Sequence, residues 1–357
     1  MEGARKQLEE LFEIAIERDA TDIHISPEKP PIIRIDGRLT PLTERPSLTP
    51  QDTQAVAFAL LASEEQKEKF FKDRDLDMSF SYKNKARFRI NIYQQLGRIS
   101  IAMRLIPTKI RSIEELNLPE ILHQFTKSSQ GFFLVVGPSG HGKSTAMAAM
   151  INEINHTHYD HIVTIEDPIE YVFLEDKCII DQREVGVDVT GFERGLRAAF
   201  RQDPDIVMIG EMRDAETVAS AVTAAETGHL VFATLHTNTA AQTIDRIIDI
   251  FPPHQQGQIR TQLASTMLGI LSRRLIPCLK GGMINAVELM IANAAIRSLI
   301  REKKIHQIDM VIETSADEGM ISLNRSLSNL VKSGIISLDQ AEVYSTNISE
   351  LRMLLLK

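Results

Sequence analysis

Residues 137–145, GPSGHGKST, contain the most informative pattern in this sequence. They fit G-x-x-x-x-G-K-[ST], the pattern of a phosphate-binding loop. The apolar run GFFLVV (131–136) precedes them, and KSTAMAAMINEI (143–154) follows with apolar residues at helical spacing. A strand, a glycine-rich turn and a helix N-terminus point several backbone N–H groups and the positive end of a helix dipole at one spot. These residues therefore predict a strand–loop–helix unit that binds phosphate.

Individual positions of the predicted loop have expected roles. Its three glycines permit unusual backbone geometry and a close approach of phosphate groups. Lys143 is expected to reach the β- and γ-phosphates of ATP, and Ser144 to place its hydroxyl on Mg²⁺. His141 occupies a variable position and receives no separate role. We predict that ATP binds through nine positions: Gly137, Pro138, Ser139, Gly140, His141, Gly142, Lys143, Ser144 and Thr145. The alternative interpretation is a turn that only joins a strand to a helix.

Length and composition exclude several classes of protein. With 357 residues, 43% of them hydrophobic, the chain is long enough for two domains or one large one, and a disordered or fibrous chain is excluded. Two cysteines cannot build a disulfide framework or a four-thiolate zinc site, which favours a reducing compartment. No run approaches the roughly 18 apolar residues of a transmembrane helix, and the first residues resemble an amphipathic helix and not a secretion signal. We expect a cytoplasmic protein with no transmembrane segment.

Charge is distributed unevenly along the chain. The formal net charge of −8 argues against a dedicated nucleic-acid partner, because such proteins carry a basic footprint. Eight basic residues and no acidic one lie between Lys83 and Arg111, whereas residues 113–357 carry an acidic excess. Near this change lies IPTKIRS (106–112), a polar stretch with a proline. We predict two domains and a linker: residues 1–106, residues 114–357 and, between them, residues 107–113.

The first part of the chain is predicted to be a small α+β domain. DIHIS (22–26) and PIIRIDG (31–37) are separated by turn residues, which predicts a hairpin. Helical periodicity from about Gln51 to Phe71 predicts helical structure in this stretch. Three further segments alternate polar and apolar residues, as half-buried strands do: DLDMSFSY (75–82), KARFRINIY (85–93) and RISIAMRLI (98–106).

From Leu116 onward, alternating strand and helix patterns predict the parallel βαβ units of an α/β fold. After about Gln255 the pattern turns helical, except for a strand predicted at MINAVELMI (283–291). The final stretch, ISELRMLLLK (348–357), predicts a helix that docks on the core. Besides residues 131–136, three short runs are nearly all apolar, as strands buried on both faces must be: residues 161–165, 205–210 and 229–235.

Two acidic side chains follow predicted strands of this second part. Glu166 lies in TIEDPIEY (164–171), directly after HIVTI, and Glu211 lies in DPDIVMIGEMRD (203–214), shortly after IVMI. The carboxyl ends of parallel strands form the ligand-binding edge of an open α/β sheet, so we expect both carboxylates beside the phosphate loop. Nucleotide hydrolysis needs a group that orients or deprotonates water and an acid that helps to hold Mg²⁺. We predict these roles for the pair, the second segment resembling a Walker B element with Glu in place of Asp.

Structural roles are the alternative for the acidic residues that follow strands. Asp167 would then form a turn with the proline after it, and Asp214 would cap a helix. Two histidines, His229 and His236, lie at the two ends of another apolar run. A lone histidine is more often a structural hydrogen-bonding residue than a catalytic one, so this spacing alone gives neither a function.

Together these segments resemble a known group, the secretion ATPases of the type II and type IV pilus superfamily, and within it the PilT-type and PilU-type pilus retraction ATPases. The resemblance rests on five segments: residues 137–145, TIEDPIEY (164–171), RQDPDIVMIGEMRD (201–214), TGHLVFATLHTN (227–238) and AIRSLIRE (295–302). It implies a RecA-like P-loop ATPase domain with a smaller N-terminal α+β PAS-like domain. It also implies a homohexameric ring.

The resemblance further implies roles and partners. Glu166 would be the general base for water, Glu211 would lie near Mg²⁺, and His229 would act in phosphate sensing. His236 would help to couple the nucleotide to domain motion, with residues 107–112 as the hinge. The partners implied are an inner-membrane pilus platform protein and a paralogous retraction ATPase, which places the chain at the inner face of the cytoplasmic membrane.

Basic residues of the first domain follow a period of two, which groups them by strand face. In KNKARFRINIY (83–93) the period places four of them on one face: Lys83, Lys85, Arg87 and Arg89. Arg98 and Arg104 likewise share a face, away from the apolar residues of their strand. The resemblance implies that these two arginines contact nucleotide phosphates, where an arginine stabilises transition-state charge. The alternative is a solvated or salt-bridged strand face.

Several related functions compete with pilus retraction. Pilus extension and type II secretion ATPases usually carry an added N-terminal domain and a four-cysteine zinc element. Here the loop begins at Gly137 and the chain has two cysteines, so retraction is favoured. A nucleotide-gated assembly scaffold without significant hydrolysis is disfavoured by the intact Lys143, Glu166 and Glu211. DNA translocation is disfavoured by the negative charge and the 5% aromatic content. Ser298, where the retraction motif has Asn, and QREVGVD (182–188) leave the choice between PilT and PilU types open.

Overall fold

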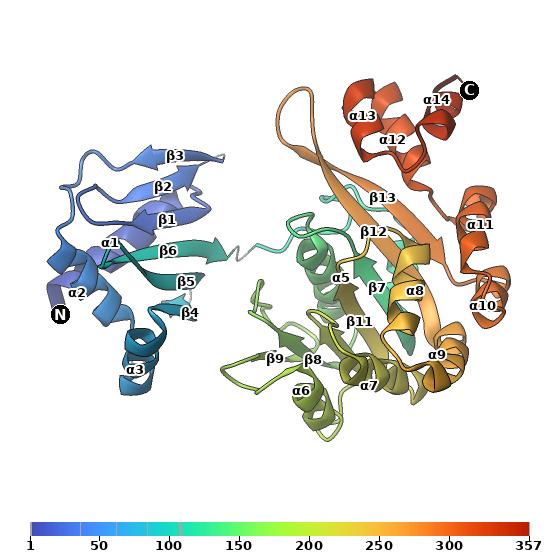
Figure 1. The fold of residues 1–357 in the computed structure, drawn as a ribbon, viewed down its shortest axis with the longest axis horizontal. Coiled ribbons are helices and arrows are strands. Elements are labelled where there is room, and N and C mark those ends of the chain that lie inside the picture. Colours follow the sequence, from blue (N-terminus) through green and yellow to red (C-terminus); the bar gives the residue numbers. More distant parts are fainter. Residues whose placement is uncertain (1, 36, 62, 84, 107–108, 357) are drawn as a thin grey trace. The chain divides into compact units, whose positions relative to one another are not determined.

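The computed structural model describes residues 2–35, 37–61, 63–83, 85–106 and 109–356. The chain divides into two compact units (Figure 1): Met1–Lys109 with Glu170–Val172, and Ile110–Ile169 with Phe173–Lys357. Two residues of the predicted linker, Pro107 and Thr108, lie outside the described residues.

The first unit is a six-stranded antiparallel sheet with three helices packed against it. The strand order is β3-β2-β1-β6-β5-β4. The strands are β1 (Asp22–Ile25), β2 (Ile32–Ile35), β3 (Arg38–Pro41), β4 (Asp75–Tyr82), β5 (Ala86–Gln95) and β6 (Arg98–Ile106). The helices are α1 (Glu2–Glu17), α2 (Pro50–Leu60) and α3 (Glu64–Asp73). The antiparallel registers confirm the predicted hairpin and the three later strands.

Apolar residues at alternate strand positions build the core of the first unit. Phe88 and Ile90 of β5 are fully buried, and Ile101 and Met103 of β6 are each only 1% exposed. Phe12 of α1 stacks on Phe88 with the ring centroids 4.1 Å apart. The α+β prediction for this part of the chain is therefore confirmed.

The predicted helical stretch at residues 51–71 is confirmed, and it is divided between two helices, α2 and α3. The hydroxyl of Ser63 accepts a hydrogen bond from the backbone N–H of Gln66 at 3.2 Å. The side-chain oxygen of Gln66 accepts one from the N–H of Ser63 at 3.3 Å. Such a capping box satisfies two donors at a helix start, and a new helix begins here for that reason.

The predicted position of Lys83 and Lys85 on one strand face is wrong. Both residues precede β5 and lie in its connection from β4. Their ammonium groups pair with Glu9 and Glu13 of α1 at 2.7 and 2.8 Å. The chain turns here, since the backbone N–H of Lys85 donates to the carbonyl oxygen of Tyr82 at 2.9 Å. The two arginines that follow do lie on β5.

The second unit is a seven-stranded sheet of order β13-β12-β7-β11-β10-β8-β9. All neighbours are parallel except β13, which is antiparallel to β12. The strands are β7 (Gly131–Val136), β8 (His161–Glu166), β9 (Ile179–Glu184), β10 (Ile206–Ile209), β11 (Leu230–Leu235), β12 (Met267–Pro277) and β13 (Met283–Ile291). The predicted α/β class and all five predicted strands of this part are confirmed.

Helices alternate with these strands along the chain (Figure 1). The α-helices are α4 (Leu122–Thr126), α5 (Lys143–Thr157), α6 (Phe192–Ala199), α7 (Ala215–Glu226), α8 (Ala240–Asp249), α9 (Pro253–Thr266), α10 (Ala294–Arg301), α11 (Ile308–Thr314), α12 (Leu323–Lys332), α13 (Leu338–Tyr344) and α14 (Ile348–Leu356). Two short 3₁₀ helices are η1 (Ile305–Gln307) and η2 (Ala316–Glu318). No helix of the described part of the chain is long and apolar enough to cross a bilayer.

Strand β12 lies where the sequence pattern predicts helices, so that prediction is wrong for residues 267–277. The strand is buried along almost its whole length and therefore lacks the period of two that marks a half-buried strand. The predicted C-terminal helix is present as α14, and its Leu351 is fully buried in a cluster with Leu323 and Leu327 of α12. The prediction that this helix docks on a core is confirmed.

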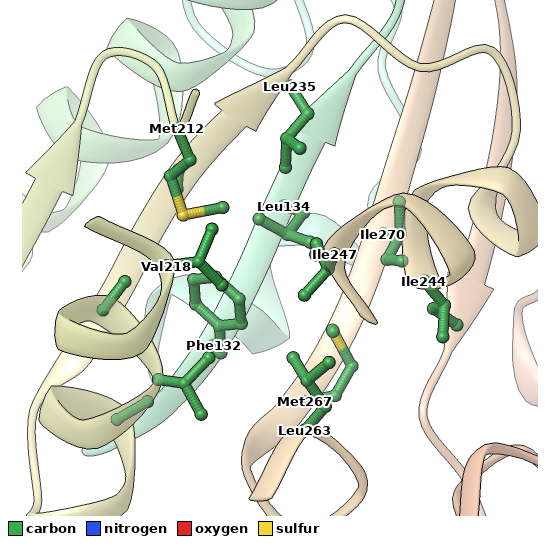
Figure 2. Packing of buried hydrophobic residues seen from close by; sticks show 14 of the residues in the cluster. Phe132, Leu134, Met212, Val218, Leu235, Ile244, Ile247, Leu263, Met267 and Ile270 are labelled. Atoms are coloured by element: carbon green, nitrogen blue, oxygen red, sulfur yellow. The ribbon is translucent and has the colours of Figure 1, made fainter. Parts of the chain in front are cut away.

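The core below the phosphate loop joins β7 to three helices (Figure 2). Phe132 and Leu134 of β7 pack in one cluster with Val218 of α7, Ile247 of α8 and Leu263 of α9, and none of these five is more than 1% exposed. Burying a large apolar side chain stabilises a fold by about 1.5–3 kcal/mol relative to leaving it in water. All six residues of β7 are buried, so the strand that leads into the loop is held on both faces.

Candidate active site

The phosphate loop is the turn between β7 and α5. β7 ends at Val136, and α5 begins at Lys143 with Gly142 as its N-cap. Gly137, Gly140 and Gly142 have positive φ angles of 143°, 77° and 75°. Residues with a Cβ rarely adopt such angles, so the backbone path requires glycine at these positions. The turn leads directly into the N-terminus of a fifteen-residue helix, which is the arrangement that attracts phosphate.

Strand β12 supports this loop. A Cβ at Gly137 would lie 2.6 Å from the carbonyl oxygen of Arg273, and a Cβ at Gly142 would lie 3.1 Å from the guanidinium of the same residue. Arg273 is 1% exposed, and its Nη1 donates to the carbonyl oxygen of Gly142. The backbone N–H of Leu275 donates to Nδ1 of His141 at 2.9 Å. Two residues of β12 therefore contact three positions of the loop.

His141 thus has a structural role that its variable place in the motif does not indicate. Burial lowers the pKa of His141, and the positive charges of Arg274, Lys143 and Arg273 lower it further. The imidazole is therefore neutral at neutral pH, and Nδ1 keeps the lone pair that accepts the hydrogen bond from β12.

Arg273 is a site residue that the sequence analysis missed, because its strand was not predicted. Two adjacent arginines inside the apolar run LGILSRRLI (268–276) were the available signal, since a buried cation requires hydrogen-bond partners. The second of them, Arg274, bonds elsewhere, donating to the backbone and side-chain oxygens of Asn238 at 2.9 and 3.0 Å.

Lys143 connects the loop to the neighbouring strand ends. The residue is 8% exposed, and Nζ donates to the carbonyl oxygens of Gly137 at 2.9 Å and Pro138 at 3.0 Å. Nζ also lies 3.3 Å from Nδ1 of His236, whose Nε2 lies 3.6 Å from a carboxylate oxygen of Glu211. An ammonium group only donates, so Nδ1 of His236 accepts the hydrogen bond from Lys143. The histidine therefore lies between the loop lysine and the acid that follows β10.

Glu211 lies two residues after the end of β10 and is held by Arg213. The guanidinium donates through Nε and, at 2.9 Å, through Nη2 to the two carboxylate oxygens. These hydrogen bonds hold the pKa of Glu211 below its ordinary value, although burial opposes them, and the nearby His236 acts in the same direction as the arginine. The carboxylate therefore stays ionised into the acidic pH range, as a ligand for a divalent cation must.

Glu166 is the last residue of β8 and is only 5% exposed. Its carboxylate accepts hydrogen bonds from the hydroxyl of Thr164 at 2.8 Å and from the amide nitrogen of Gln182 at 3.1 Å. A Cβ on Gly210 would lie 3.2 Å from the Cα of Glu166. The segment that leads to Glu211 therefore passes directly beside Glu166, and the two acids follow neighbouring strands at one edge of the sheet.

The structure places His229 at the opposite end of the strands from the loop. It precedes β11, whose first residue pairs with Gly131 at the start of β7. Six residues of strand separate this end from the loop, which is roughly 20 Å at about 3.3 Å per residue. Its Nδ1 lies 3.0 Å from the carbonyl oxygen of Ala224. Within one chain the structure does not bring His229 to the other predicted site residues.

Asp214 adopts the alternative capping role: its side chain accepts a hydrogen bond from the backbone N–H of Thr217 at 2.7 Å, at the N-terminus of α7.

Arg98 and Arg104 lie in the first unit and share an exposed face of β6, opposite buried Ile99, Ile101 and Met103. Each has an acidic partner within its own unit. Arg98 pairs with Glu28 at 2.6 Å, and Arg104 pairs with Asp22 at 2.9 Å. The predicted strand face is confirmed, while contact with nucleotide phosphates stays a prediction.

The donor groups beside the loop suit Mg²⁺. Among the described residues no cluster of three or more His, Cys, Asp or Glu side chains is arranged to hold a metal ion. Nucleotide-bound Mg²⁺ needs no such cluster, because phosphates and waters supply most of its ligands and the protein adds one or two oxygens. The Ser144 hydroxyl and the ionised Glu211 carboxylate are hard oxygen donors of this kind.

Comparison with known proteins places the chain in a family. The sequence profile described as "Type II/IV secretion system protein" matches residues 3–341. The chain belongs to this family. It is 42% identical to the type IV pilus retraction ATPase PilT of Pseudomonas aeruginosa, over 93% of this chain and 96% of that protein. It is 35% identical to the type IV pilus ATPase PilU of the same organism, over 98% and 91%.

A solved structure supports the same assignment. The crystal structure of the pilus retraction motor PilT with bound ADP matches with a TM-score of 0.91 and 46% identity, over 97% of this chain and 98% of that one. This member of the secretion family is a P-loop ATPase, and its second unit is the RecA-like domain. The predicted family, fold class, nucleotide binding and ATPase activity are thereby confirmed.

Gly137→Ala should weaken nucleotide binding much more than Gly140→Ala. A positive φ costs either alanine roughly 1–2 kcal/mol. Only at Gly137 would the new Cβ also meet a backbone oxygen, at 2.6 Å, whereas nothing lies within 4 Å at Gly140. We expect at least a tenfold difference in Kd for a fluorescent ADP, which corresponds to about 1.4 kcal/mol. Equal losses in the two variants would contradict support of the loop by β12.

Arg213→Gln should move the acid limb of the ATPase pH profile to higher pH. In the wild type, the lowered pKa of Glu211 keeps the carboxylate ionised until the pH falls through that value. Removing the guanidinium removes the largest cause of the lowered pKa, while burial still raises it. The pKa of Glu211 should therefore rise, and its carboxylate should become protonated at higher pH. The profile should be recorded between about pH 4 and 7. Arg197→Gln, at an exposed pair with Glu193 on α6, is the matched control. An unchanged acid limb in Arg213→Gln would contradict the argument.

Proposed function

We propose that this ATPase is a motor that powers type IV pilus retraction. The observation that carries the proposal is a complete phosphate loop with Glu166 and Glu211 at the same sheet edge, in a chain similar to PilT over nearly the full length of both proteins. The higher identity with PilT, 42% against 35% for PilU, favours a PilT-type role.

In this proposal the loop holds the triphosphate of ATP. Backbone N–H groups, the α5 N-terminus and Lys143 contact the phosphate oxygens, because all three present positive charge at one place. Ser144 and Glu211 hold Mg²⁺, which when bound offsets the charge of the phosphate groups. The lysine then exchanges its hydrogen bonds to the loop carbonyls for bonds to phosphate.

Glu166 acts as the general base in the proposed reaction. Its carboxylate takes a proton from the water that attacks the γ-phosphate, and Thr164 and Gln182 orient the carboxylate through their hydrogen bonds. His236 lies between Lys143 and Glu211. Loss of the γ-phosphate would remove an anion that Lys143 contacts directly and Glu211 contacts through Mg²⁺. This position suits the predicted coupling of the nucleotide state to motion.

We further propose a homohexamer in which Arg98 and Arg104 complete the nucleotide site. Both arginines are exposed, and exchange of Glu28 and Asp22 for phosphate would free their charge for the transition state. Phosphate sensing by His229 requires a neighbouring subunit, since the residue lies far from the loop of its own chain. The linker at residues 107–113 would be the hinge between residues 1–106 and 114–357.

The partners follow from this role. A retraction motor would work at the inner face of the cytoplasmic membrane and transmit force to an inner-membrane platform protein, with a paralogous retraction ATPase as a further partner. The presence of Lys143, Glu166 and Glu211 favours an enzyme that hydrolyses ATP over a scaffold that only binds it. The similarity to PilT favours a role in pilus retraction over a role in pilus extension.

Lys143→Ala and Glu166→Gln should separate binding from hydrolysis. Lys143→Ala removes the loop cation and should abolish detectable ATP binding. Glu166→Gln keeps a hydrogen-bond acceptor for Thr164 but removes the base, so binding should persist while turnover falls about 10²–10⁴-fold. Phosphate release and nucleotide Kd measured on the same samples test both. Wild-type turnover in Glu166→Gln would refute the assignment of the base.

Deleting the gene should leave surface pili in excess, because an extension motor would continue without opposition. Twitching should stop, and expression of the wild-type chain should restore it while Glu166→Gln should not. Cells without any surface pili after the deletion would instead indicate an extension ATPase.

Mass measurement of the purified chain with and without Mg²⁺-ATP tests the proposed hexamer.

A further inference from the structure

Arg273 lies within a series of hydrogen bonds that starts at the phosphate loop. Its Nη1 donates to the carbonyl oxygen of Gly142, and its Nη2 donates to the side-chain oxygen of Asn285 on β13. The amide nitrogen of Asn285 donates in turn to the carbonyl oxygen of Leu116 at 2.6 Å. The series therefore runs from the start of α5, through β12 and β13, to residues 113–118.

Both ends of the Asn285 amide are used, which determines its orientation. A guanidinium only donates, so it must face the amide oxygen. A carbonyl only accepts, so Leu116 must face the NH₂ group. A flipped amide would set donor against donor and acceptor against acceptor. A displacement at either end is therefore resisted by a directional contact at the other.

Residues 113–118 lie near the start of the second unit, which begins at Ile110, and include the last residue of the predicted linker. Ile113, Leu116 and Leu118 are 1%, 4% and 6% exposed, so this segment is packed in the unit. The backbone N–H of Leu118 donates to the carbonyl oxygen of Ile113 at 3.1 Å. This segment is therefore held by burial and by its own backbone hydrogen bonds.

We propose that Arg273 and Asn285 are positioning residues that couple the occupancy of the phosphate loop to the stability of residues 113–118. Phosphate bound to the loop N–H groups fixes the backbone at Gly142, which strengthens its bond to Arg273. An ordered guanidinium holds Asn285, and Asn285 holds Leu116. The inference rests on nucleotide binding by the loop and not on the pilus partner.

The test uses amide hydrogen exchange of the full chain with and without saturating Mg²⁺-ADP. In the wild type, ADP should slow exchange at residues 116–118 by about fivefold or more, the lower end of coupling between sites. Asn285→Asp keeps an acceptor for Arg273 but has no proton to donate to Leu116. In this variant the slowing should disappear. Because coupling is reciprocal, ADP should bind more weakly by about the same factor as the slowing that is lost.

Asn324→Ala is the matched control. Asn324 is also buried in the second unit, but it bonds to the carbonyl oxygen of Asn347 and to Glu350 in the α12–α14 cluster. Its loss should leave the ADP effect at residues 116–118 unchanged. Arg273→Gln is a second variant. Its side chain is too short to reach the carbonyl oxygen of Gly142, so the ADP effect at residues 116–118 should again be absent.

Three results would overturn the proposal. The first is that ADP does not change the exchange rate at residues 116–118 of the wild type. The second is that ADP slows exchange equally in Asn285→Asp. The third is that Asn324→Ala also loses the ADP effect, which would indicate general loosening of the second unit. A wild-type chain that binds no Mg²⁺-ADP would refute the nucleotide site itself. Binding measured by calorimetry therefore distinguishes failure of the coupling from failure of the proposed function.

Discussion

Parallel strands that end at one edge of the sheet are the constraint on which this active site depends. The register pairs Val136 with Leu235, and it pairs Ile209 with both Ile165 and Ala233, so four buried strands end close to one another. The phosphate loop, His236, Glu211 and Glu166 come from distant parts of the chain and meet because each lies at one of these ends. A strand buried on both faces cannot slide without exposing apolar surface, which keeps the ends aligned.

The loop itself depends on a neighbour that carries a buried charge. Burying an arginine is costly unless its N–H groups are hydrogen-bonded, and Arg273 bonds to Gly142 and Asn285. The same residue presents its carbonyl oxygen where a side chain on Gly137 would collide. The glycines of the motif therefore serve two purposes, since they accommodate phosphate on one side and β12 on the other.

Local patterns predicted those parts of the molecule whose physical cause is local. Residues 131–136 and 283–291 are strands with the predicted bounds, because short apolar runs between turns leave few alternatives. The pattern failed at residues 267–277, where a strand that is buried along almost its whole length has no period of two. Lys83 lies off its predicted face because the chain turns between β4 and β5, where the N–H of Lys85 donates to the carbonyl oxygen of Tyr82.

The sequence by itself determined the phosphate loop, the α/β class and the identity of the two acids, because backbone conformation at glycine, strand burial and residue chemistry act over a few neighbours. Only the tertiary structure decided that Arg273 lies behind the loop, that His236 joins Lys143 to Glu211, and that His229 lies at the far end of its strand. These arrangements depend on which strands become neighbours. Contacts between segments separated by about a hundred residues follow from packing, and no local pattern records them.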